Sequence, residues 1–284
     1  NFVKSTIRAS LNSDAFPWKV VRSLRSGTIV LGYHGVAADE SITDPWIQRS
    51  QTPLSEFRSH LEFIGKHFEV VSADQCLENP SAKRQVHLTF DDGYTGFAEH
   101  AVPAMSEFGF PASVYVVSEA LSNQSKLPPF TGRAAIGHCS PGQISLDSVG
   151  LNFNITDRAS RMAAYSELAN VLKTGNPTAV STLIDELTAL LPADKWDDLS
   201  KLYETENLMD WNALQKVSKS GFTVGAHTQT HLSLSNLQTD SDIEQEVQGS
   251  IEAVRRELGS CDWFAYPNGT TDDWSQTAAK AVKN

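Results

Sequence analysis

The chain has 284 residues, of which 40% are hydrophobic and 20% are charged, and this length can bury a large core as one α/β barrel. Its formal net charge of −11 argues against a nucleic-acid partner or an anionic membrane partner, because phosphates would be repelled overall. The cysteines are odd in number and widely spaced, which predicts neither a disulfide framework nor a Cys-x-x-Cys metal pair; they are Cys76, Cys139 and Cys261.

The segment before the first predicted strand is basic. Its basic residues are Lys4, Arg8, Lys19, Arg22 and Arg25. Such a pattern is typical of a solvated helix face, and a weak contact with a membrane surface is the alternative. No apolar run is long enough for a signal peptide or a transmembrane helix. We therefore expect a cytoplasmic protein, although a secreted or periplasmic protein with its signal removed would look the same.

Short apolar runs alternate with helical patterns along the chain. The runs predict strands at residues 28–33, 86–90, 112–117, 222–225 and 263–266. Helical spacing of apolar residues predicts helices at residues 54–67, 97–108 and 243–258, the last with an acidic outer face. This alternation predicts βα units around a parallel sheet.

Residues 121–205 interrupt the alternation. A Pro/Gly-rich stretch is followed by two or three helical patterns between residues 157 and 203. We expect a mainly helical insertion, within a single domain that spans residues 1–284, and we expect it to form one wall of a cleft. Its aromatic residues could stack on sugars, but in a helical insertion such side chains are more often core; they are Phe130, Phe153, Tyr165 and Trp196.

Carboxylates and histidines follow two of the predicted strands. Asp91 and Asp92 come directly after residues 86–90, and His227 and His231 come after the strand predicted at 222–225. Each segment alone has an ordinary explanation, a turn for the acids and a surface or core position for the histidines. At one end of a parallel sheet, however, two histidines and a carboxylate could bind one cation together. Three such ligands leave coordination positions on the cation open for water and substrate, as a catalytic zinc-type site requires.

Another histidine, His34, ends the strand predicted at residues 28–33. It could equally be a satisfied histidine at a strand end. The remaining histidines lack a comparable setting, and we expect them to be structural or surface residues; they are His60, His67, His87, His100 and His138.

Three segments occur in the order seen in polysaccharide deacetylases. They are Leu88-Thr-Phe-Asp-Asp-Gly93, His227-Thr-Gln-Thr-His231 and Phe264-Ala-Tyr-Pro-Asn-Gly269. From about Gly27 to Asp273 the chain resembles carbohydrate esterase family 4. Its Tyr33-His34 pair resembles the exopolysaccharide-deacetylase branch, in which the motif order is permuted. The resemblance implies a distorted, seven-stranded, TIM-like (β/α) barrel and removal of N-acetyl groups from a glycan or amino-sugar substrate.

The resemblance also implies a metal site. Asp92, His227 and His231 would bind a divalent cation, with zinc preferred and cobalt, nickel or manganese as alternatives. Asp91 would be the general base that deprotonates the metal-bound water. His34 would be the general acid that protonates the departing amine.

The third motif supplies an oxyanion donor and a departure from the family. The backbone N–H of Asn268 would stabilise the oxyanion, although an ordinary Pro-Asn-Gly turn explains the same residues. Many family members have an arginine to orient the base where this chain has Ala265, so another residue would have to orient Asp91. The chain lacks an initial Met and stops at Asn284, soon after this motif. We therefore expect an incomplete C-terminus or the permuted order.

Other functions fit the same residues. O-acetyl ester removal, sugar deformylation and cleavage of small amides would use the same catalytic centre. A non-catalytic glycan-binding protein that retains the fold is the alternative from another class. Ala265 and the short tail favour it, whereas the complete set of acids and histidines argues against it.

Overall fold

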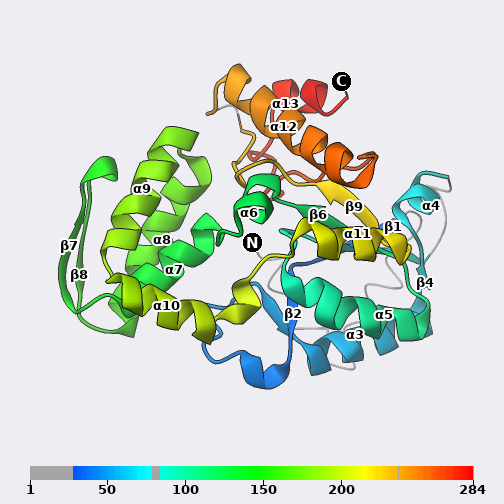
Figure 1. The fold of residues 1–284 in the computed structure, drawn as a ribbon, viewed down its shortest axis with the longest axis horizontal. Helices are drawn as coiled ribbons and strands as arrows, with labels where there is room; N and C mark the ends of the chain where they lie inside the picture. Colours follow the sequence, from blue (N-terminus) through cyan, green and yellow to red (C-terminus); the bar gives the residue numbers. More distant parts are fainter. Residues whose placement is uncertain (1–27, 79–83, 236, 284) are drawn as a thin grey trace.

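The computed structural model describes residues 28–78, 84–235 and 237–283 (Figure 1). The basic segment from Lys4 to Arg25 lies outside these ranges. Within them, no helix has both the length and the apolar character needed to cross a membrane. The three cysteines are unpaired.

A parallel sheet organises the molecule. Its strands follow the order β1-β5-β6-β9, with a short strand β4 beside the start of β5. The bounds are β1 Thr28–Tyr33, β4 Glu69–Val70, β5 Gln85–Phe90, β6 Ala112–Val116 and β9 Thr223–Ala226. Every residue of β5 is buried, as expected for a parallel strand covered on both faces. Four of the five predicted strands are confirmed to within a residue at each end.

The helices that cover the sheet also match the sequence pattern. Helix α3 (Leu54–His67) has the predicted bounds and buries Phe57, Leu61 and Ile64. The helix predicted at 97–108 begins as a π-helical turn and continues as α5 (Val102–Phe108), which packs beside α3. Helix α11 (Trp211–Lys219) and helix α12 (Asp240–Leu258) contact β9. The remaining helices here are α4 (Ala73–Glu78) and α13 (Gln276–Ala281).

The prediction of a strand at residues 263–266 is wrong. Only an isolated bridge joins Phe264 to Ala226, and Pro267 follows, which cannot donate a hydrogen bond to a ladder. The sheet of the described residues therefore has five strands, and the predicted number of seven is not found there. Two short strands, β2 (Gly35–Ala37) and β3 (Gln51–Pro53), form a separate parallel pair.

Residues 121–205 fold to one side of the sheet (Figure 1). Their helices are α7 (Pro128–His138), α8 (Arg158–Thr174), α9 (Pro177–Ala189) and α10 (Ala193–Leu202), preceded by α6 (Ser118–Asn123). They surround a hydrophobic cluster that is separate from the cluster around the sheet. Phe130, Phe153 and Tyr165 are buried in it, so these aromatic residues are core.

An antiparallel hairpin in this region was not predicted. Strands β7 (Gly142–Leu146) and β8 (Leu151–Ile155) pair along their length. Alternate residues such as Ile144 and Phe153 are buried while their neighbours are exposed. That period of two, interrupted at Gly150 with its positive φ of 65°, is the signal that identifies a hairpin.

Candidate metal centre

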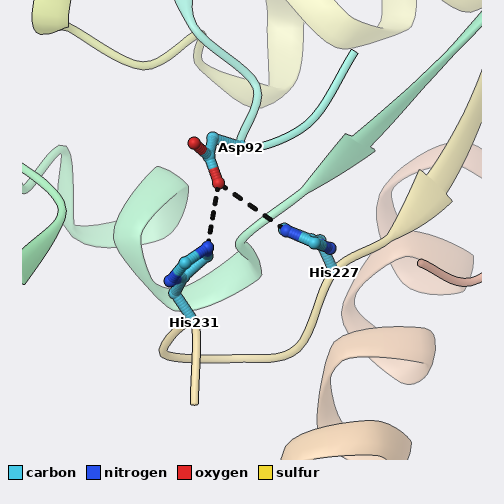
Figure 2. A group of neighbouring side chains, drawn as sticks. All are labelled: Asp92, His227 and His231. Carbon is cyan, nitrogen blue, oxygen red and sulfur yellow. Dashed lines mark ion pairs between the residues drawn. The ribbon is translucent and has the colours of Figure 1, made fainter. Parts of the chain in front are cut away.

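Asp92, His227 and His231 meet at the carboxyl ends of the strands. The Asp92 Oδ1 atom lies 3.3 Å from Nε2 of His231 and 3.7 Å from Nε2 of His227. One potential ligand atom from each residue lies within 4.8 Å of the others. Figure 2 shows both rings directed at the same carboxylate oxygen. The sheet explains the meeting, because β5 and β9 are parallel and each flanks β6, so their ends lie at the same edge.

A backbone contact orients the first histidine. The Nδ1 atom of His227 lies 2.9 Å from the carbonyl oxygen of Ala265. Because a carbonyl only accepts hydrogen bonds, Nδ1 carries the proton and Nε2 is left free to bind a cation. The Ala226–Phe264 bridge brings Ala265 to this position. The residue that lacks the family's arginine side chain thus contributes its backbone to the site.

The fit to a cation is supported by the burial of the carboxylate. The Asp92 side chain is 5% exposed, and its Oδ1 atom has no hydrogen-bond partner among the described residues. Burial opposes its ionisation, but the nearby charges of His231, His34 and His227 outweigh burial and lower the pKa of Asp92. An ionised oxygen that faces two imidazoles without a hydrogen bond suits a divalent cation.

The two histidines respond differently to this setting. Burial lowers the pKa of His227 despite the opposing charge of Asp91, which favours the neutral, ligand form of the ring. Burial also opposes protonation of His231, but the charge of Asp92 prevails and raises the pKa of His231. A bound cation would therefore have to displace a proton from His231.

Strained backbone is concentrated at the same place. Asp92, Thr228, His231 and Asn268 have positive φ values of 77°, 67°, 68° and 70°. Residues other than glycine rarely adopt this conformation, and it persists where the surrounding structure enforces it, often at functional sites.

The predicted base and acid lie beside the three ligands. The backbone N–H of Asp91 donates to the carbonyl of Tyr33, which joins the end of β5 to the end of β1. His34 follows Tyr33, is exposed, and is close enough for its charge to affect the pKa of Asp92. No hydrogen bond to the Asp91 carboxylate forms within the described residues, so a substitute for the missing arginine is not found there.

The remaining sequence predictions have mixed outcomes. Asn268 lies on an exposed turn shortly after Ala265, and its role as an oxyanion donor stays a prediction. His87 bonds through both ring nitrogens, to Val71 and Ser113, and is structural.

Sequence reasoning missed Glu246. The sequence predicts an acidic outer face for the helix at residues 243–258, whereas Glu246 on this helix is only 4% exposed and accepts hydrogen bonds from the segment between the two histidine ligands. Its spacing from Ile243 and Ser250 places it on the buried face of the helix, and this was the signal available in the sequence.

Similarity to known proteins identifies the family of the chain. The family described as Polysaccharide deacetylase matches residues 78–284, which is more than half of the chain. The chain belongs to the polysaccharide deacetylase family. "Putative polysaccharide deacetylase YxkH" of Bacillus subtilis (strain 168) is 20% identical over 104 residues, which are 34% of each protein. The match thus spans about a third of that relative's length.

Solved deacetylase structures share the fold of this family member. IcaB from Ammonifex degensii has a TM-score of 0.54 at 15% identity, with 91% of this chain and 80% of that chain covered. A de-N-acetylase from Aggregatibacter actinomycetemcomitans has a TM-score of 0.54 at 14% identity, with coverages of 90% and 84%. The α/β fold predicted from the sequence, a distorted (β/α) barrel, is therefore confirmed. The predicted number of seven strands is not confirmed.

Proposed function

We propose that this polysaccharide deacetylase family member is a metal-dependent hydrolase that removes N-acetyl groups from a glycan, releasing acetate and leaving an amino sugar. The observation that carries the proposal is the buried Asp92 oxygen facing His227 and His231, with a second carboxylate, Asp91, beside it. Two structurally similar proteins support the choice of reaction. One is described as a de-N-acetylase, and PplD of Streptococcus pyogenes is described as a deacetylase in complex with acetate.

Asp92, His227 and His231 would hold the cation, for which we propose zinc, with cobalt, nickel or manganese as alternatives. When bound there, the cation would lower the pKa of a water molecule and polarise the acetamide carbonyl. Asp91 would accept the proton of the attacking water, since its carboxylate is half-buried beside the ligands.

Two further residues complete the proposed reaction. His34 is exposed, so a substrate can reach it, and it would donate a proton to the amine as the carbon–nitrogen bond breaks. Without that proton an amine is a poor leaving group. The backbone N–H of Asn268 would donate to the oxyanion. Asn268 follows Pro267 and has a left-handed φ of 70°.

We also propose that residues 121–205 are an insertion in a single domain and form one wall of the glycan cleft. Contacts with the loops of the site support this. The Nζ atom of Lys173 on α8 lies 2.8 Å from Oδ1 of Asp273, which is on the loop that carries Asn268. In addition, the side-chain amide of Gln238 donates to the carbonyls of Thr174 and Gly175.

The proposal is tested by measuring acetate release from N-acetylglucosamine oligomers with metal-stripped protein and added divalent ions. We expect release to require the ion and to be lost in Asp91→Asn, while the variant still binds the ion. Asp198→Asn, an exposed acid on α10, is the matched control and should behave like the wild type. Full activity of Asp91→Asn would exclude it as the base.

O-acetylated and N-formylated sugars belong in the same assay, because an esterase or deformylase would use the same residues. Ion-dependent release from those substrates alone would replace the N-deacetylase proposal. Tight glycan binding with no turnover under any ion would instead favour a binding protein.

A further inference from the structure

The backbone between His227 and His231 is held from two sides. We call residues 227–231 the histidine loop; Figure 2 shows its path between the two ligands. On one side, the carbonyls of Thr228 and Gln229 accept hydrogen bonds from the backbone N–H groups of Ser118 and Glu119 in α6, at 3.2 and 3.0 Å. The carbonyls of the loop therefore find partners at the end of the neighbouring strand β6.

On the other side, one carboxylate accepts three hydrogen bonds from the histidine loop. The Glu246 Oε2 atom accepts the backbone N–H groups of Gln229 and Thr230, each at 2.9 Å. Its Oε1 atom accepts the hydroxyl of Thr230 at 2.7 Å. Glu246 is 4% exposed and lies on α12, whose neighbouring side chains Ile243 and Val247 are buried in the core. The carboxylate is thus fixed to a long, anchored helix.

The loop needs such support because its conformation is unfavourable on its own. Thr228 and His231 have φ values of 67° and 68°, a region that residues other than glycine rarely occupy and β-branched residues least of all. Three hydrogen bonds to one buried carboxylate outweigh that preference locally. His227 has separate support from β9 and from the Ala265 carbonyl, whereas His231 lies at the far end of the loop.

We propose that Glu246 is a positioning residue that holds the histidine loop so that His231 faces the same cation position as Asp92 and His227. This inference rests on the proposed metal site and not on the identity of the substrate. Glu246 touches neither the cation nor the substrate; it acts through the backbone of Gln229 and Thr230. Contacts that orient the ligands of a metal site typically raise its metal affinity or its activity about 10- to 100-fold.

The test measures cobalt binding to metal-stripped protein by titration of its visible absorption. Glu246→Ala should lower the affinity about 10- to 100-fold, the usual effect of removing such a support. Glu246→Gln should stay within a few fold of the wild type, because its amide oxygen can accept both N–H groups and its NH₂ can donate to the Thr230 hydroxyl. Glu244→Ala, an exposed acid on the same helix, is the matched control and should bind like the wild type.

Thermal unfolding of the metal-free variants separates positioning from general destabilisation. If Glu246→Ala does not fold, Thr230→Val removes only the bond to Oε1 and should still lower cobalt affinity several-fold. Unchanged cobalt affinity in folded Glu246→Ala would overturn the inference, and so would a Glu246→Gln variant as weak as Glu246→Ala. If the wild type binds cobalt but releases no acetate, the proposed reaction fails while the affinities still decide the role of Glu246.

Discussion

Asp92 is a buried carboxylate whose Oδ1 atom receives no hydrogen bond within the described residues. Leaving such an atom unpaired usually costs a folded protein about 1–3 kcal/mol. The nearest groups are two imidazole nitrogens, and one of them is oriented by the Ala265 carbonyl so that it presents a lone pair. At the scale of single residues, the site is therefore arranged around a position of positive charge.

His34 provides a residue-scale prediction about the bond that is cleaved. Replacing it with alanine should lower kcat/KM on an N-acetylated sugar about 10²- to 10⁴-fold, the usual contribution of a general acid. The loss on an O-acetylated sugar should be smaller, because an alcohol leaves with less protonation than an amine does. Both substrates are assayed with the same cobalt-loaded variant. Equal losses would mean that His34 does not protonate the leaving group.

At the scale of elements, a buried polar cluster joins the sheet region to residues 121–205. The Glu206 carboxylate accepts a hydrogen bond from Gln51 of β3 at 3.0 Å and lies 3.7 Å from the guanidinium of Arg133 on α7. Arg133 in turn donates to the carbonyl of Ile47. Burial raises the pKa of Glu206 to about 7, against the opposing effects of Arg133 and Gln51.

This raised pKa predicts how stability depends on pH. The folded protein holds the Glu206 proton more tightly than the unfolded chain, whose glutamate pKa is near 4.5. The contribution of Glu206 to the free energy of unfolding is fully present below pH 4.5. It is lost as pH rises through about 7, which lowers the free energy of unfolding by about 3 kcal/mol. Urea unfolding at several pH values should show the wild type losing stability relative to Glu206→Gln across this window. A pH-independent difference would contradict the raised pKa.

At the scale of the whole molecule, the proposed cation site connects segments that are far apart in the sequence. Asp92 follows β5, and both histidines follow β9. A cation that binds only the folded chain stabilises it by mass action, by about 2.7 kcal/mol at 100 times Kd. The proposed site would therefore contribute to the stability of the sheet as well as to the proposed reaction.

Zinc should accordingly raise the Tm of the metal-stripped protein in proportion to the logarithm of its concentration. Asp92→Ala should abolish the increase, because it removes a ligand while leaving β5 intact. Differential scanning calorimetry at several zinc concentrations measures the Tm of the wild type and of Asp92→Ala. An equal increase in the variant would show that zinc binds elsewhere on the chain.

Local patterns were sufficient for much of the fold and for locating the candidate metal centre. The apolar runs located β1, β5, β6 and β9. In β5 and β6 the run is continuous because every residue is buried, as in parallel strands covered on both faces. The spacing of Phe57, Leu61 and Ile64 located α3. The order of the three motifs indicated which acids and histidines lie together. Those features depend on residue type and spacing, which are written in the chain.

The sequence by itself thus determined the class of fold, the strands that carry the site and the candidate ligands. Only the tertiary structure decided that residues 263–266 form a single bridge, that the Ala265 carbonyl orients His227, and that Glu246 is turned inward to hold the histidine loop. Each of these depends on partners distant in the sequence, whose backbone groups have no residue-specific signature. The contacts arise when β9 and α12 pack together, because burial then requires every polar group between them to find a partner.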